Sequence, residues 1–141
     1  MKKRSGPVLP AAQHNAAKTL FVDRSIGKYP VGALRAAGAS VVYLEDIFPG
    51  ATYDEVWLAE AGRQGWIAVT KDKRIRHKPN QMKAFQESNV VAVVLVSGNM
   101  GREEMADLLC RSMNRILRIA GAVVPPAMFT LARDGKLNRK F

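Results

Sequence analysis

Residues 65–72 read GWIAVTKD, and this stretch indicates the fold most directly. A glycine suited to ending a helix precedes a run of apolar and β-branched residues, which is typical of a short strand buried in a sheet. The run stops at Lys71 and Asp72. We therefore predict a buried strand over residues 66–70 that places an acidic side chain at its carboxyl end.

Similar apolar runs occur before and after this stretch, and helical patterns separate them. Strands are expected at 19–22, 41–44 and 90–96, with a further one at 128–131. Helices are expected at 30–37, at 52–64, around Met82 and Phe85, and at 105–117, where apolar residues recur every three or four positions. Strands alternating with helices predict an α/β fold, namely a single-domain, three-layer α/β/α sandwich with a mainly parallel sheet of four or five strands.

The composition suits one globular domain with a polyanionic partner. The chain has 141 residues and a net charge of +10, from 22 Lys and Arg against 12 Asp and Glu. We expect a flexible basic N-terminal segment over 1–18, the domain over 19–133 and a basic C-terminal tail over 134–141. The charge favours nucleic acid as a partner. Because no apolar run approaches the ~20 residues of a membrane span and no signal-like segment opens the chain, we expect a cytoplasmic protein without membrane contact.

Acidic residues follow the predicted strands at the point where each strand ends. Asp23 follows the first strand, Glu45 and Asp46 the second, and Asp72 the third, while Asp54 opens a helix. The carboxyl ends of parallel strands meet at one sheet edge, where ligands bind in such folds. Two carboxylates about 5 Å apart repel by roughly 3 kcal/mol at an effective dielectric near 20, so a hard divalent cation is expected among them.

Asp23, Asp54 and Asp72 are accordingly predicted as catalytic residues and as ligands of Mg²⁺ or Mn²⁺. Asp46 is a further predicted metal ligand, chosen over its neighbour Glu45 because only one of two adjacent strand residues can face the crevice. Such an ion can lower the pKa of a bound water and neutralise charge on a phosphate. These acids also have structural alternatives: Asp23 and Asp72 could cap turns through their own backbone, and Asp54 lies in a first helical turn, where the helix dipole favours a negative charge.

Glu55 has its own structural alternative. Thr52 and Glu55 have the spacing of a capping box, in which the two side chains satisfy the first backbone N–H groups of a helix. We therefore favour the capping role for Glu55.

A basic loop follows the third strand. It offers side chains for RNA phosphates, and the predicted nucleic-acid-binding residues are Lys71, Lys73, Arg74, Arg76, His77 and Lys78. The alternative is that this run of charges is simply a solvated loop. Its position beside Asp72 favours binding.

Four segments together resemble a known family. They are Phe21-Val22-Asp23, residues 33–38, Asp54-Glu55 and residues 65–72. They are similar to the compact branch of PIN-domain ribonucleases related to VapC toxins, over roughly residues 20–95. The resemblance implies a metal-dependent endoribonuclease, often the toxin of a type II toxin–antitoxin pair, with Asp23, Asp54 and Asp72 matching the metal-binding acids.

The same resemblance implies a cognate antitoxin that covers the crevice, and a homodimer. The chain departs from the family pattern at Ser97-Gly98-Asn99, where PIN proteins frequently have another acid. The number of metal ions and the activity itself are therefore left open.

Two other functions are compatible with the sequence. A receiver-type phosphoacceptor domain could use Asp72, Ser97 and Lys136, although such domains carry an acidic pair after strand one, where this chain has Asp23-Arg24. The other is a catalytically inactive PIN-like module that binds RNA or a protein. The missing acid near residue 97 motivates it.

Overall fold

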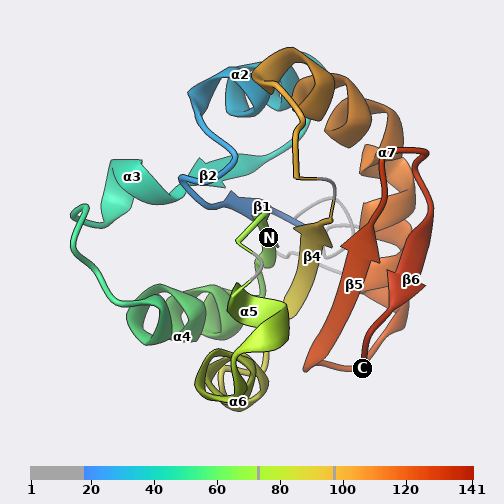
Figure 1. Cartoon of the computed structure of the whole chain (residues 1–141). Helices are drawn as coiled ribbons and strands as arrows, with labels where there is room; N and C mark the ends of the chain where they lie inside the picture. Colours follow the sequence, from blue (N-terminus) through green and yellow to red (C-terminus); the bar gives the residue numbers. More distant parts are fainter. Residues whose placement is uncertain (1–17, 73, 97) are drawn as a thin grey trace, which may run out of the picture.

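A six-stranded, mostly parallel sheet forms the centre of the molecule (Figure 1). The computed structural model describes residues 18–72, 74–96 and 98–141, and the side chain of Arg76 also lies outside the description. In sheet order the strands are β2 (Val41–Tyr43), β1 (Leu20–Val22), β3 (Ile67–Thr70), β4 (Val91–Leu95), β5 (Ala127–Leu131) and β6 (Leu137–Arg139). The first five run parallel, and β6 pairs with β5 in the antiparallel sense.

Helices cover both faces of the sheet, as Figure 1 shows. One layer consists of α2 (Lys28–Ala36) and α7 (Arg102–Ala122), which contact each other. The other consists of α4 (Asp54–Gln64), α5 (Arg74–His77) and α6 (Pro79–Glu87), and the short α3 (Leu44–Ile47) follows β2. The predicted three-layer α/β/α class is confirmed. No helix in the described ranges combines the length and the apolar character that crossing a membrane requires.

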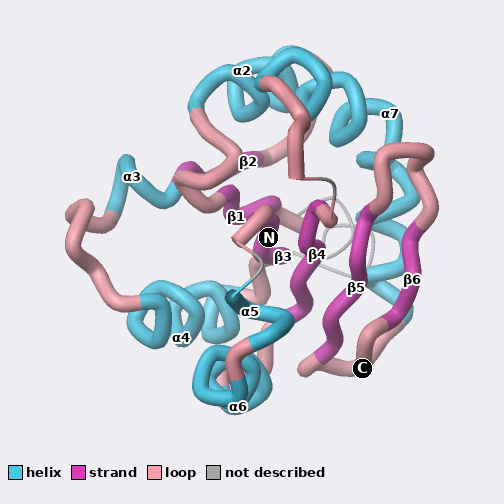
Figure 2. The backbone as a smooth tube through the Cα atoms, viewed as in Figure 1, coloured by secondary structure: helices cyan, strands magenta, loops and turns pink. Residues whose placement is uncertain are grey.

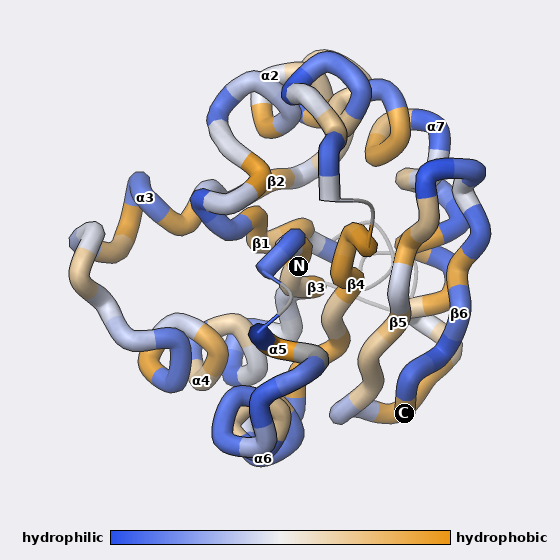
Figure 3. The backbone as a smooth tube through the Cα atoms, viewed as in Figure 1, coloured by the Kyte–Doolittle hydropathy of each residue, from blue (hydrophilic) through white to orange (hydrophobic). Residues whose placement is uncertain are grey.

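Alternating strand residues supply two apolar cores, one on each face of the sheet. Leu20 and Val22 of β1 belong to the core under α2 and α7, whereas Phe21 between them belongs to the core under α4 and α6. This alternation follows from the period of two along a strand. The central strands are accordingly mostly hydrophobic in Figure 3, while α6 is mostly hydrophilic. Burial from both sides explains the continuous apolar runs in the sequence.

The strand order creates a crevice between β1 and β3. The chain leaves β1 toward α2 on one face of the sheet and leaves β3 toward α5 and α6 on the other, as the tube in Figure 2 shows. The two connections therefore diverge beyond the carboxyl ends of adjacent strands, which is the place where doubly wound sheets bind ligands. Residues that follow β1 and β3 line this place.

The C-terminal residues belong to the sheet, which corrects the expectation of a separate basic tail over 134–141 and of a sheet with at most five strands. The backbone turns at Gly135, whose φ is 89°, and β6 then pairs with β5. The Phe141 ring lies 6.1 Å from the Phe85 ring in an edge-to-face contact. An edge strand with one face in solvent needs few apolar residues, so the polar sequence of β6 gave no strand signal.

Candidate active site

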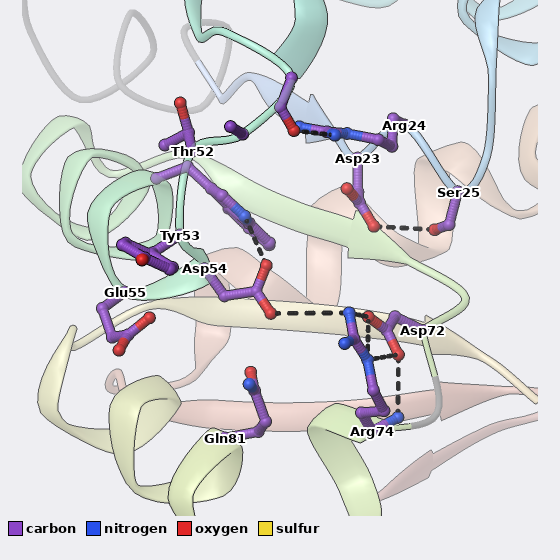
Figure 4. A pocket seen from close by; sticks show the side chains of 13 residues that line it. Asp23, Arg24, Ser25, Thr52, Tyr53, Asp54, Glu55, Asp72, Arg74 and Gln81 are labelled. Atoms are coloured by element: carbon purple, nitrogen blue, oxygen red, sulfur yellow. Dashed lines mark hydrogen bonds and ion pairs between the residues drawn. The ribbon is translucent and has the colours of Figure 1, made fainter.

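A pocket of about 450 Å³ opens beyond the carboxyl ends of β1 and β3 (Figure 4). Its acidic lining residues are Asp23, Asp54, Glu55 and Asp72, and its basic ones are Arg24 and Arg74. The structure thus brings together the three predicted catalytic aspartates, which lie far apart in the sequence. Acidic side chains outnumber basic ones in this pocket although the chain as a whole carries a net charge of +10.

Asp23 is held by hydroxyl groups from two segments. Its side chain follows β1 and is only 8% exposed. The Ser25 hydroxyl and the Thr70 hydroxyl each donate to its Oδ2 at 2.8 Å. Thr70 is the last residue of β3 and is fully buried. Hydrogen bonds to the ionised form stabilise a buried carboxylate, so this pair of donors fixes Asp23 at the pocket wall.

Asp54 is the first residue of α4, where the helix dipole favours a negative charge. The Trp57 indole N–H donates to its Oδ1 at 3.0 Å. Burial raises the pKa of the Asp54 carboxyl above its ordinary value, while the hydrogen bond from Trp57 and the charge of Arg74 act in the opposite direction. The Asp54 carboxylate is therefore oriented by Trp57 but incompletely compensated in charge.

Asp72 lies two residues past β3 and is tightly paired with Arg74. The Arg74 Nε–H lies 3.0 Å from both Oδ1 and Oδ2, and its Nη2 lies 2.6 Å from Oδ2. The Arg74 backbone N–H donates to Oδ1 at 3.0 Å. The hydrogen bond from the guanidinium is the main reason that the pKa of Asp72 is lowered. Asp54 and Asp72 thus have pKa values displaced in opposite directions within one pocket.

The Arg74 guanidinium also connects the two acids. Its Nη2 lies 4.0 Å from Asp54 Oδ2, and Figure 4 shows the group between the Asp54 and Asp72 side chains. Within the ranges that the structure describes, no three Asp, Glu, His or Cys side chains converge closely enough to hold a metal ion. The donors themselves are carboxylate oxygens, which suit Mg²⁺ or Mn²⁺. The chemistry of the donor set therefore fits such an ion, while Arg74 is the cation between Asp54 and Asp72 in this conformation.

Asp46 does not reach the pocket, which corrects its prediction as a metal ligand. The chain passes from β2 directly into α3, so Asp46 lies on a helical turn and not at an extended strand end. Its side chain is 58% exposed, and its Oδ2 lies 3.9 Å from Arg35 Nη2.

The capping box predicted for Thr52 and Glu55 is also wrong. Helix α4 begins at Asp54, its N-cap residue is Tyr53, and no side-chain capping hydrogen bond forms there. Glu55 instead lines the pocket.

Arg74 is the one predicted RNA-binding residue among the described pocket-lining side chains. His77 and Lys78 are exposed outside the pocket, and Lys71 is half-buried. Lys73 and the side chain of Arg76 lie outside the described residues.

Sequence reasoning missed the residues that hold the acids in place. Ser25 and Thr70 stand two positions after Asp23 and two positions before Asp72, and hydroxyls so close to predicted strand ends were a usable signal. Trp57 is buried in the core, with 2% exposure, and its hydrogen bond to Asp54 was not foreseen. Gln81 also lines the pocket, and its buried Oε1 has no hydrogen-bond partner among the described residues.

Comparison with known proteins gives one family. No curated protein and no solved structure matches the chain significantly. A family model described as "PIN like domain" matches residues 19–97. The matched range extends from β1 through β4 and contains every acidic residue that lines the pocket.

Proposed function

The chain belongs to the PIN-like domain family, and from this premise we propose that it is a metal-dependent endoribonuclease whose active site is the pocket beyond β1 and β3. Membership of this family is compatible with a nuclease-type function. The observation that carries the proposal is the meeting of Asp23, Asp54 and Asp72 in that pocket. These acids come from three separate segments, and the switch point of the sheet is where such a fold places its ligand.

Asp23, Asp54 and Asp72 would hold the divalent cation. When bound, Mg²⁺ or Mn²⁺ supplies a water of lowered pKa and neutralises charge on the phosphate. The other residues orient these ligands: Ser25 and Thr70 hold one oxygen of Asp23, and Trp57 holds one oxygen of Asp54. Fixed carboxylates reduce the reorganisation that cation binding requires.

Basic groups near the pocket would hold the RNA backbone. Arg24 lines the pocket and donates to the Gly50 carbonyl, and Arg74 lies opposite. His77 and Lys78 follow Arg74 in the chain and are exposed, and Lys71 precedes it. Lys73 and Arg76 are further proposed contacts. Phosphate contacts of this kind predict an affinity that falls steeply as salt rises.

The alternatives have less support. Strand order alone does not separate a nuclease from a receiver-type phosphoacceptor domain, because the order β2-β1-β3-β4-β5 seen here is the flavodoxin-like order, which receiver domains also have. Family membership favours the nuclease. Lys136 lies at the turn before β6, where its N–H donates to Asp134, and Ser97 lies outside the described residues. A toxin role with a cognate antitoxin, and a homodimer, are narrower predictions that neither the fold nor the family match tests.

The inactive RNA-binding module remains the second candidate for a specific reason. Arg74 stands between two of the three acids, and no three acids in the described ranges are close enough to hold a metal ion. A protein locked in this arrangement would bind RNA without cutting it.

Cleavage of labelled single-stranded RNA distinguishes the two candidates. We expect cleavage with Mg²⁺ or Mn²⁺ that EDTA abolishes, and a loss of about a hundredfold or more in Asp72→Asn. Asp107→Asn is the matched control, since Asp107 is exposed on α7 and pairs with Arg111 outside the pocket. Binding of the RNA without metal-dependent cleavage would refute the nuclease and support the binding module.

A further inference from the structure

Arg74 occupies the position that a cation would need in order to bridge Asp54 and Asp72. We propose that Arg74 is an internal competitor of the divalent cation, holding these two carboxylates in the metal-free protein and leaving both when the ion binds. The inference rests on the proposed function, because it concerns the same pocket. It adds to that function a movement of the Arg74 side chain away from Asp54 and Asp72.

Both oxygens of Asp72 accept hydrogen bonds from Arg74 in this arrangement, and the single Nε–H is shared between them. Oδ1 accepts from the Arg74 backbone N–H and from Nε, and Oδ2 accepts from Nε and from Nη2. An ionised carboxylate offers about four lone-pair sites in all. Three hydrogens of Arg74 lie on these sites and its guanidinium is 2.6 Å from Oδ2, so a metal ion that coordinates Asp72 has to displace at least part of that group.

Asp23 and Asp54 accept fewer hydrogen bonds than Asp72. Asp54 accepts from Trp57 through Oδ1, and its Oδ2 lies 4.0 Å from Arg74. Both donors to Asp23 use Oδ2, and Oδ1 accepts no hydrogen bond from the described residues. Asp23 and Asp54 could thus offer one oxygen each, and Asp72 is the acid whose availability depends on Arg74.

The exposure of the two partners indicates which of them moves. The Arg74 side chain is 56% exposed, whereas the Asp72 side chain is only 19% exposed. The guanidinium can therefore turn toward water while the carboxylate stays in the pocket wall. The backbone N–H of Arg74 can keep its bond to Oδ1 during this movement, so α5 need not unfold.

The Arg74 guanidinium and a divalent cation compete for the same carboxylates through their charge as well as through the space they fill. The guanidinium carries one positive charge at 2.6 Å from Asp72 and 4.0 Å from Asp54. A divalent ion placed nearby would be repelled by that charge and would have to displace it. Removing the charge should therefore strengthen metal binding, although Arg74 makes favourable contacts in the metal-free protein.

The test is Mn²⁺ affinity, measured by calorimetry and by electron paramagnetic resonance of free Mn²⁺, in the parent, Arg74→Gln and Arg74→Lys. We expect Arg74→Gln to bind Mn²⁺ about tenfold more tightly, with Arg74→Lys between it and the parent. Arg133→Gln is the matched control, because the Arg133 side chain is 52% exposed, close to the value for Arg74, and its ion pair with Glu104 at 2.8 Å lies outside the pocket. This variant should bind within about twofold of the parent.

Thermal unfolding gives a second measurement that does not depend on catalysis. Without metal, Arg74→Gln should melt below the parent because an ion pair is lost, yet saturating Mn²⁺ should raise its melting temperature by more. If the parent binds Mn²⁺ and Arg74→Gln binds it equally well or more weakly, this inference alone is overturned. Absence of binding in the parent and in every variant would overturn the proposed function as well.

Discussion

The hydroxyl of Thr70, at the end of β3, donates to Asp23 Oδ2, at the end of β1, at 2.8 Å. The same hydroxyl oxygen accepts from the Asp72 backbone N–H at 3.0 Å. One buried side chain therefore ties two of the candidate metal ligands across neighbouring strands. The contact couples the apolar core of the sheet to the geometry of the pocket.

Replacing Thr70 with Val should damage both stability and metal binding. The change leaves Asp23 Oδ2 with one donor and the Asp72 N–H without its acceptor, at a cost of about 1–2 kcal/mol. We expect the melting temperature to fall by about 3–6 °C and Mn²⁺ affinity to fall about tenfold. Thr130→Val is the control, because its hydroxyl makes only a 3.5 Å contact to Asn138. Equal effects in the two variants would rule out a special role for Thr70.

Asp54 and Asp72 should give opposite pH dependences when each is changed to Asn. Burial raises the pKa of Asp54, so its ionised form costs stability as pH rises through that pKa. Asp54→Asn cannot ionise and keeps an acceptor for Trp57. Its stability relative to the parent should therefore improve as the pH rises above about 4, the ordinary pKa of an aspartate.

The pKa of Asp72 is lowered by Arg74, so ionised Asp72 stabilises the fold above its unfolded pKa, and this stability is lost as pH falls through the folded pKa. Asp72→Asn should hence be less stable than the parent at neutral pH, and the difference should shrink in acid. Melting temperatures measured in EDTA across this pH range test both variants. If the stability of both variants relative to the parent changed with pH in the same direction, the raised pKa of Asp54 and the lowered pKa of Asp72 would be contradicted.

The position of α4, and hence of Asp54, depends on the close approach of Gly62 to the end of α6. A Cβ at Gly62 would collide with the Ser88 carbonyl oxygen. Gly62→Ala should therefore cost about 1–3 kcal/mol or more, measured by urea unfolding. A Cβ at Gly32 in α2 would meet nothing within 4 Å apart from its own helical turn, so Gly32→Ala should stabilise by about 0.5–1 kcal/mol. Tolerance of alanine at Gly62 would mean that the two helices are further apart.

Release of Arg74 should link metal binding to RNA binding. A guanidinium that has left Asp72 can make a bidentate contact with a phosphate, so Mn²⁺ should strengthen the binding of a cleavage-resistant 2′-O-methyl RNA. Fluorescence anisotropy with and without Mn²⁺ measures the effect. We expect a smaller gain in Arg74→Gln than in the parent. An equal gain in both would show that Arg74 takes no part in this coupling.

The fold and the central acids could be predicted from sequence because both follow from buried strands. Continuous apolar runs mark strands covered on two faces, and their ends locate Asp23 and Asp72. The rule that parallel strands share a carboxyl edge then brings these acids together. The position of Asp54 was predicted from the start of its helix, which the structure has at Asp54 itself.

The misassigned residues depend on local turns that residue spacing does not determine. Asp46 was wrongly predicted as a metal ligand because the chain becomes helical immediately after β2. The pairing of Arg74 with Asp72 was not foreseen, because it depends on the turn into α5, which folds the Arg74 side chain back onto that acid. Strand β6 was missed because a solvent-exposed edge strand carries little apolar pattern.

Crystals soaked in Mn²⁺ and measured for anomalous scattering test the central claim most directly. The account predicts one strong peak in the pocket, about 2.1 Å from oxygens of Asp23, Asp54 and Asp72, with the Arg74 guanidinium displaced from Asp72. A pocket without a peak at saturating Mn²⁺, with Arg74 still paired to Asp72, would contradict it.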